Sequence, residues 1–338
     1  MTTYPQIKGL RVKYLSADPA GAEQGEVWYN STTGSVRLAN TTLSGTWSSA
    51  NACNTSRRFF QGCGSQTNGI MAGGFSPGAS PPMYNQTEEF DGTNFTNGGN
   101  LGAGTYGATM FGPGTATVFA GGGDNSSPLT TTQHYNGSSW SSPGNNLPNG
   151  RQQAGGCGTQ AAGVLFGGSA PSANMTASLE YNGSWTAVPG TLNVGRRSLN
   201  GTGTGTQTDC IGAGGYGASG YTNSSETYNG TIWTATPNLN TARGVASMNA
   251  EGSTSSAILA CGSGPSPGTG IATEIYDGSA WTTSGNLALS RSQAGSGGTG
   301  SAMWVAAGDP SSPSNAAPSR TAETFALVSN STQTVTLS

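Results

Sequence analysis

The chain has 338 residues, a formal net charge of −3 at pH 7 and only 8% charged residues. This balance lacks the basic surface that a phosphate backbone requires, so we expect no nucleic-acid partner. No stretch approaches the roughly 18 apolar residues of a membrane span, and the first residues lack the apolar core of a signal peptide, so we expect no membrane insertion. Glycine is abundant at 56 residues, yet aromatic residues recur at fixed intervals, which predicts an ordered array rather than a disordered chain.

Residues 1–42 differ from the rest of the chain in composition. Segment 25–38, GEVWYNSTTGSVRL, alternates apolar and polar residues around STTG and predicts a β-hairpin. Residues 1–42 contain both lysines of the protein, and in them we treat five residues as candidates for attachment to a partner: Lys8, Arg11, Lys13, Trp28 and Tyr29. We therefore expect an N-terminal attachment segment, 1–42, followed by a second domain, 43–338.

Three kinds of marker residue recur at intervals of about 45 to 48 residues. A tryptophan closes each copy, with Phe95 in one of them: Trp47, Trp140, Trp185, Trp233 and Trp281. An arginine opens each copy, with Tyr106 as the exception: Arg57, Arg151, Arg196, Arg243 and Arg291. An aromatic residue precedes a turn, usually Asn-Gly: Phe90, Tyr135, Tyr181, Tyr228, Tyr276 and Phe325. Asn-Gly between strand-like runs predicts a hairpin with a type I′ turn.

Each copy contains about four short strand-like segments and no helical pattern. A period of about 40–50 residues with this content is typical of β-propellers, in which each sheet buries its faces against its neighbours. We predict an all-β fold, a six-bladed propeller with four-stranded antiparallel blades. The first strand, as in 57–64, is expected to line the central channel, and the second, as in 162–168, to be the buried middle of its blade.

The positions of the outermost markers predict how the ring closes. Trp47 precedes any opening arginine, whereas Phe325 is followed by Asn330 where a tryptophan would stand. We therefore expect residues 43–49 to supply the outer strand of the blade that begins at Arg291, which would protect an open sheet edge. A seven-bladed ring that uses the N-terminal residues is the alternative and fits the count less well. Alternation in 331–338 predicts either an edge strand or pairing with the N-terminal segment.

Gly-Gly at the end of the second strand, an aromatic on the third and a tryptophan on the fourth resemble the kelch repeat over about residues 47–330. These copies differ from intracellular kelch proteins because they are nearly free of charge. The segment GEVWYN with TTG is similar to the leaders of tail and other virion structural proteins of marine bacteriophages. This resemblance implies a structural protein on the phage particle, made in the host cytoplasm, homo-oligomeric and bound to other virion proteins through its N-terminal segment. The plainer alternative is an ordinary hairpin packed on the propeller.

Three functions follow from this interpretation. The first is a non-enzymatic adhesin, such as a tail fibre, whose variable loops between the second and third strands bind host-surface polysaccharide. Scattered tyrosines, Tyr84, Tyr216 and Tyr221, suit stacking on sugars. The second is a purely architectural decoration of capsid or tail. The least expected is a polysaccharide-degrading enzyme that uses Glu180, Asp124 or Asp309.

A glutamate stands two residues before the third-strand aromatic in four copies: Glu88, Glu226, Glu274 and Glu323. Gln133 and Leu179 take this place in the other two. Because a buried arginine needs a partner, we predict ion pairs within the blades rather than an anion site in the channel.

The remaining reactive residues indicate little chemistry. The one histidine, His134, is expected on a strand surface without a catalytic role, and we expect no cofactor and no metal. Asp124 and Asp309 follow equivalent Gly-rich steps; they are either Ca²⁺ ligands on one rim or, as we favour, solvated starts of loops. Asp91 and Asp277 replace the asparagine of the turn. The five cysteines are predicted to be free and buried.

Overall fold

The computed structural model describes residues 12–19, 26–40, 44–78, 80, 82–171, 173–201, 205–248, 253–310, 318–328 and 331–335. These residues form strands and loops, with no helix among them and hence none that could cross a membrane. The chain divides into two compact units, Met1–Ser44 with Val328–Ser338, and Gly45–Leu327. Lys8 and Arg11 lie outside the described residues.

The first unit contains one four-stranded sheet in the order β1 (Lys13–Leu15), β2 (Val27–Asn30), β3 (Ser35–Asn40) and β32 (Ser331–Val335). The predicted hairpin is confirmed, because β2 and β3 pair antiparallel around residues 31–34. The Asn30 Oδ1 atom holds this turn by accepting the amide N–H groups of Thr32 and Thr33 at 3.0 and 3.1 Å. Strand β32 pairs antiparallel with β3, so the second unit ends earlier than the predicted domain 43–338.

The described residues of the second unit form six four-stranded sheets, named by their order in the chain. The first three are the first sheet, β5 (Gln61–Ser65), β6 (Asn68–Ala72), β7 (Thr87–Phe90) and β8 (Phe95–Asn97); the second sheet, β9 (Thr109–Phe111), β10 (Val118–Ala120), β11 (Thr132–Tyr135) and β12 (Trp140–Ser141); and the third sheet, β13 (Gly155–Gly158), β14 (Gly163–Phe166), β17 (Ser178–Tyr181) and β18 (Trp185–Val188).

The other three are the fourth sheet, β19 (Asn200–Gly201), β20 (Cys210–Ala213), β23 (Ser225–Tyr228) and β24 (Trp233–Thr236); the fifth sheet, β25 (Ser247–Met248), β26 (Ala257–Ala260), β27 (Thr273–Tyr276) and β28 (Trp281–Thr283); and the sixth sheet, β29 (Gly295–Gly298), β30 (Ala302–Ala306), β31 (Ala322–Val328) and β4 (Ser44–Ala50). Two small hairpins, β15 (Ser169–Ala170) with β16 (Ala173–Asn174) and β21 (Tyr216–Gly217) with β22 (Gly220–Tyr221), lie in the loops between second and third strands. The all-β prediction with four-stranded sheets is confirmed, and the arrangement is consistent with a β-propeller-like fold.

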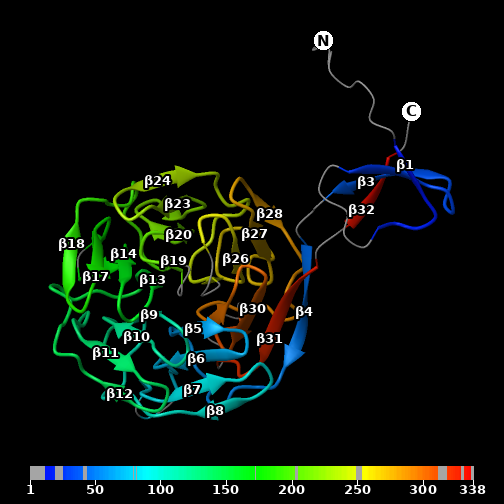
Figure 1. Ribbon diagram of the computed structural model, residues 1–338. Coiled ribbons are helices and arrows are strands. Elements are labelled where there is room, and N and C mark those ends of the chain that lie inside the picture. Colours follow the sequence, from blue (N-terminus) through cyan, green and yellow to red (C-terminus); the bar gives the residue numbers. More distant parts are fainter. Residues whose placement is uncertain are drawn as a thin grey trace. The chain divides into compact units, whose positions relative to one another are not determined.

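The six four-stranded sheets of the second unit are arranged around a common centre, with the first strand of each sheet innermost (Figure 1). Neighbouring inner strands come so close that side chains would not fit. A Cβ on Gly62 would lie 2.8 Å from the carbonyl oxygen of Ser296, and one on Gly201 would lie 2.6 Å from that of Gly156. Glycine is therefore required where these backbones meet, as the sequence predicted.

A closed ring of six backbone hydrogen bonds links successive sheets just before their first strands. The amide N–H of Gly107 donates to the carbonyl of Phe59 at 2.7 Å, and that of Phe59 donates to Gln293 at 3.1 Å. The ring runs through Phe59, Gly107, Gln153, Ser198, Val245 and Gln293 and returns to Phe59. All six residues have positive φ, between 47° and 63°. This conformation is uncommon outside glycine, and the shared hydrogen bonds compensate for its strain.

Strand β4 supplies the fourth strand of the sixth sheet, as predicted for residues 43–49, of which Leu43 lies outside the described residues. The Trp47 ring packs on Phe325 with centroids 5.1 Å apart. The same pairing joins third and fourth strands elsewhere, for example Tyr276 with Trp281 at 5.1 Å. An N-terminal segment of the second unit thus completes a sheet that the last repeat leaves one strand short.

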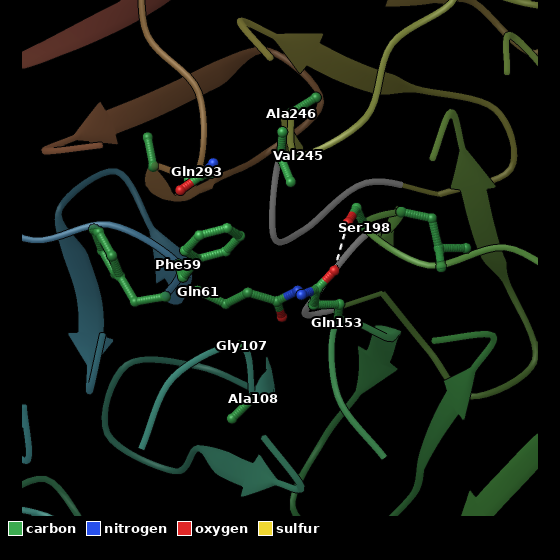
Figure 2. Close-up of a pocket in the computed structure, with 12 residues that line it drawn as sticks. Phe59, Gln61, Gly107, Ala108, Gln153, Ser198, Val245, Ala246 and Gln293 are labelled. Carbon is green, nitrogen blue, oxygen red and sulfur yellow. Dashed lines mark hydrogen bonds between the residues drawn. The ribbon is translucent and has the colours of Figure 1, made fainter. Parts of the chain in front are cut away.

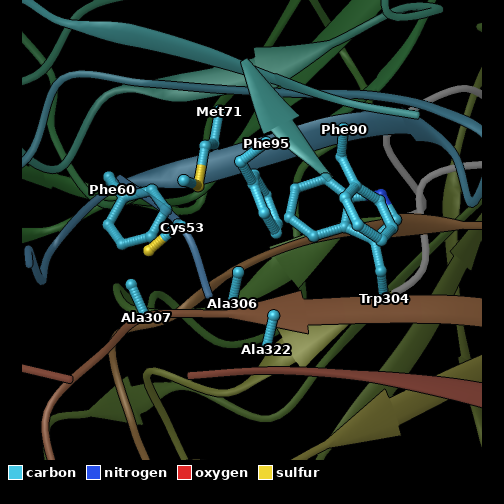
Figure 3. Packing of buried hydrophobic residues seen from close by; sticks show 9 residues of the cluster. All are labelled: Cys53, Phe60, Met71, Phe90, Phe95, Trp304, Ala306, Ala307 and Ala322. Atoms are coloured by element: carbon cyan, nitrogen blue, oxygen red, sulfur yellow. The ribbon is translucent and has the colours of Figure 1, made fainter. Parts of the chain in front are cut away.

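Apolar side chains fill the space between neighbouring sheets. Between the sixth and first sheets, Trp304 packs on Phe90 and Phe95, and Met71 and Ala306 belong to the same buried cluster (Figure 3). The second strands are buried throughout, for example β14 and β26, so the prediction that they form the middle of each sheet is confirmed. All five cysteines are buried and none forms a disulfide, also as predicted.

The turns between third and fourth strands differ from the predicted type I′ geometry. Tyr135 and Trp140 pair directly and leave a four-residue loop in which Gly137, but not Asn136, has positive φ. The Asn136 Oδ1 atom accepts the amide N–H groups of Ser138 and Ser139 at 3.0 and 2.9 Å. The asparagine is therefore selected as a side-chain acceptor rather than for a left-handed backbone, which explains why aspartate can replace it at positions 91 and 277.

Candidate binding site

Four of the repeated arginines pair with glutamates inside their own sheets. In the fifth sheet, the Arg243 Nη2 atom lies 2.5 Å from Glu274 Oε1, and both side chains are almost fully buried. The carboxylate also accepts the amide N–H of Asn240 at 2.7 Å. The corresponding pairs are Arg57–Glu88, Arg196–Glu226 and Arg291–Glu323. Because each charge is matched within its sheet, these residues hold the fold rather than present charge to a ligand.

The second sheet lacks both charged members of this pair. Thr105, not Tyr106, stands two residues before the ring residue Gly107, so the assignment of Tyr106 to the arginine position is wrong by one residue. Gln133 replaces the glutamate and accepts the amide N–H of Gly102 at 3.1 Å. A neutral acceptor thus keeps the backbone contact when no guanidinium is present.

The third sheet keeps the arginine but loses its acidic partner. Arg151 is 3% exposed, and its Nη1 atom donates to the Ala177 carbonyl at 2.9 Å. Leu179 takes the glutamate position, and Pro148, which has no N–H, takes the position of the backbone donor. Burial lowers the pKa of Arg151 to about 10. No carboxylate among the described residues forms an ion pair with it.

The repeated fourth-strand tryptophans join each sheet to the one before it. Each indole Nε1 donates to a hydroxyl at the start of the preceding sheet's third strand, for example Trp233 to Ser178 at 2.9 Å. The other pairs are Trp140–Thr87, Trp185–Thr132, Trp281–Ser225 and Trp47–Thr273. In the remaining position Phe95 belongs to the same buried cluster as Ala322. The donor and its acceptor are therefore replaced together.

A second set of contacts between sheets involves the third-strand tyrosines. Tyr228 donates to Glu180 at 2.9 Å, Tyr181 shares a hydrogen bond with His134 Nε2 at 2.9 Å, and Tyr135 donates to Glu89. Burial lowers the pKa of His134, which favours its neutral form. His134 is thus a half-buried contact between sheets rather than an isolated surface residue, and Glu180 is similarly engaged.

Asp124 and Asp309 belong to loops of different sheets and have different partners. Asp309 is 5% exposed and forms an ion pair with Arg58 at 2.5 Å, so the prediction of a solvated loop start is wrong for this residue. Asp124 Oδ1 accepts the amide N–H groups of Ser126 and Ser127 at 3.0 Å, and these bonds lower its pKa. Across the part of the chain that the structure describes, no group of three or more His, Cys, Asp or Glu residues is placed to hold a metal ion.

The hydrogen-bonded ring surrounds a cavity of about 40 Å³, too small for more than one or two water molecules (Figure 2). Gln153, Ser198, Val245 and Gln293 line it, and Ser198 Oγ donates to Gln153 Oε1 at 2.6 Å. This part of the centre is therefore packing rather than a binding site.

A depression of about 1010 Å³ lies on the face formed by the loops between second and third strands. Its walls come from three of the variable loops, those of the second, third and fourth sheets. The principal side chains that line it are Tyr106, Gln152, Asn174, Arg197 and Tyr216. This concave surface joins loops that are far apart in the sequence.

Arg197, Tyr216 and Asn174 form a fixed group in the depression. The Arg197 guanidinium carbon lies 5.0 Å from the centre of the Tyr216 ring, and its Nη1 atom donates to Asn174 Oδ1 at 3.2 Å. Asn174 Nδ2 in turn donates to the Tyr216 carbonyl at 3.0 Å. Tyr216 is 36% exposed and packs edge-on against Tyr221, which is 38% exposed. The group therefore presents a cation and an aromatic surface to solvent.

Sequence reasoning identified Tyr216 and Tyr221 but missed Arg197 and Asn174. Arg197 follows the structural residue Arg196, and nothing in the doublet shows which of the two faces outward. Only one other Arg-Arg doublet occurs in the chain, at 57–58, and its second member also lies on the loop face. The occurrence of a second arginine at the same repeat position in two copies was the sequence signal that could have indicated an outward-facing arginine.

The candidate attachment residues have different surroundings in the first unit. Trp28 is 1% exposed, and its indole donates to Asp18 at 2.9 Å, so it belongs to the interior of the unit rather than to a docking surface. Lys13 forms an ion pair with Glu26 at 2.8 Å, and Tyr29 packs against Tyr14 with centroids 4.7 Å apart.

No family model matches the chain, and no curated protein matches it. Among solved structures, one described as the structure of YjhT is similar, with a TM-score of 0.66 and 11% sequence identity. The similarity covers 83% of this chain and 99% of that one. At this identity the likeness supports the fold alone, and it agrees with a β-propeller-like arrangement.

Proposed function

We propose that this protein is a non-enzymatic structural protein of a phage particle, in which a six-bladed, kelch-like propeller binds host-surface polysaccharide through its loop face. The observation that carries the binding role is the depression of about 1010 Å³ with the Arg197, Tyr216 and Asn174 group on its wall. Aromatic faces and fixed polar groups in a concave site are the features that hold sugar rings. The virion setting rests on the leader-like segment 25–38.

Binding without hydrolysis is favoured by the positions of the acids. Glycoside hydrolysis requires two carboxyl groups that face each other across the substrate. The described residues that line the depression include no Asp or Glu. Glu180 accepts from Tyr228, and Asp309 is paired with Arg58 in a separate depression.

The first unit supplies the proposed contact with other virion proteins. Tyr14 lies in β1, which pairs with the strand that contains the buried Trp28, and yet Tyr14 is 75% exposed. Val12, which directly precedes β1, is 45% exposed. Apolar side chains this exposed on a small sheet suit a protein–protein contact. We therefore assign docking to β1 in place of Trp28.

Binding of the full chain to host cells and to isolated surface polysaccharide tests the proposal. Tyr216→Ala is expected to weaken binding about tenfold, the loss of roughly 1.4 kcal/mol. Tyr14→Ala, a matched tyrosine in the first unit, is expected to leave polysaccharide binding unchanged and to reduce incorporation into particles. Particles that contain the chain at full occupancy, combined with no affinity for any host surface, would instead support the architectural alternative.

A further inference from the structure

We infer that the depression recognises an acidic saccharide and that Arg197 binds the carboxylate of one sugar unit. This inference rests on the proposed function and names the class of its ligand. The evidence is the charge of the lining, a comparison with the equivalent arginine of another sheet, and the way in which Arg197 is held.

Arg197 is the one charged side chain among the described residues that line the depression. It is half-buried and forms no ion pair with any described residue, and its side-chain hydrogen bond to Asn174 uses one of five N–H donors. A guanidinium in a partly enclosed site gains from a carboxylate partner. The lining leaves that partner to be supplied by the ligand.

Arg58 occupies the same repeat position in the first sheet and shows what a partnered arginine looks like. Arg58 pairs across a β-bridge with Phe75, as Arg197 does with Tyr216, and each guanidinium lies over an aromatic ring. The Arg58 Nη1 atom, however, lies 2.5 Å from Asp309. Among the described residues, an acid therefore pairs with Arg58, and none pairs with Arg197.

The contacts of Arg197 fix the plane of its guanidinium before any ligand binds. Tyr216 supports one face, and Asn174 holds the Nη1 edge while its own amide is tied to the Tyr216 backbone. A fixed planar fork suits two parallel hydrogen bonds to a carboxylate. The exposed ring of Tyr216, with Tyr221 beside it, then offers a surface for the sugar ring.

Recognition must be short-range because the protein has a formal net charge of −3. A field of that sign does not attract an acidic polymer from a distance. The preference for an acidic ligand should therefore depend on Arg197 alone and weaken as salt screens the contact.

The test compares uronate oligosaccharides, from polygalacturonate and from alginate, with the same oligosaccharides after reduction of their carboxyl groups. Calorimetry with the full chain is expected to show binding to at least one uronate about tenfold tighter than to its reduced form. Arg197→Met should remove this preference, so that the uronate and its reduced form bind with equal affinity, and Arg197→Lys should keep part of it. The double variant Arg58→Met/Asp309→Asn is the matched control and should keep the full preference.

The outcomes separate this inference from the proposed function. Equal affinity of the wild-type protein for acidic and reduced forms overturns the acidic assignment and leaves polysaccharide binding in place. Tighter binding of a sulfated neutral oligosaccharide than of any uronate overturns the carboxylate assignment. Absence of binding to every oligosaccharide and to host cells overturns the proposed function, and this inference with it.

Discussion

The fifth and third sheets contain the same repeated arginine in different surroundings. In the fifth, Arg243 and the amide N–H of Asn240 converge on Glu274. In the third, Arg151 remains, but Leu179 replaces the acid and Pro148 removes the amide donor. Two of the three members changed together, and the second sheet shows a neutral version with Gln133 and Gly102. The carboxylate is therefore kept where both of its donors are present, as expected for a buried charge that needs every partner.

The largest effect is expected from Arg243→Leu. This change leaves Glu274 buried without its guanidinium and should lower the free energy of unfolding by about 3–5 kcal/mol. Urea denaturation measures it. The double variant Arg243→Leu/Glu274→Leu should lose less than the single one, because no charge is left unpaired.

Arg151→Leu tests whether the two arginines differ, because it should lower the free energy of unfolding much less than Arg243→Leu does. Arg151 has no acidic partner among the described residues, so its replacement leaves no carboxylate buried without a counter-charge. The free energy of unfolding should therefore change by less than about 1.5 kcal/mol in either direction. The same denaturation series measures both variants. An equal loss for the two arginines would show that Arg151 has a counter-charge in solution.

Trp233→Phe tests the same principle at a neutral contact. The substitution leaves the Ser178 hydroxyl without its indole donor and should cost about 1–2 kcal/mol. Adding Ser178→Ala reproduces the natural combination of Phe95 with Ala322 and should recover part of that loss. Additive losses in the double variant would contradict the coupling.

The smallest expected effect is a loss of stability at alkaline pH, which arises from buried tyrosine and cysteine side chains. Burial and the neighbouring carboxylates raise the pKa of Tyr135 and Tyr228 above the ordinary 10.0, and burial raises that of Cys63 to about 12. The folded state therefore keeps protons that the unfolded chain releases above about pH 9 to 10. Stability should be level below that range and fall as pH rises through it, as thermal melting from pH 7 to 11 would show. Rapid reaction of Cys63 with a thiol reagent at pH 8 would contradict its burial.

Features that repeat at a fixed spacing could be predicted from the amino-acid sequence alone. The four-stranded sheets, the Arg–Glu pairs and the outer strand around Trp47 could be predicted because each marker recurs locally, and an incomplete last copy reveals a missing strand. The buried thiols and the N-terminal hairpin followed from local composition in the same way. For the C-terminal strand, the sequence left open an edge strand or pairing with the N-terminal segment, and the structure shows that it pairs with β3.

Contacts between residues of different copies depend on how the sheets pack together in three dimensions. The hydrogen-bonded ring, the indole contacts to the preceding sheet and the Arg197, Tyr216 and Asn174 group each join segments that are far apart in the sequence, for example by 23 residues for Arg197 and Asn174 and by 226 for Trp47 and Thr273. The repeat marks Arg196 as the structural arginine, but it carries no signal for the residues that its neighbour Arg197 contacts in other loops. The depression exists because loops of three sheets converge on one face, and that convergence is a property of the assembled ring rather than of any single repeat.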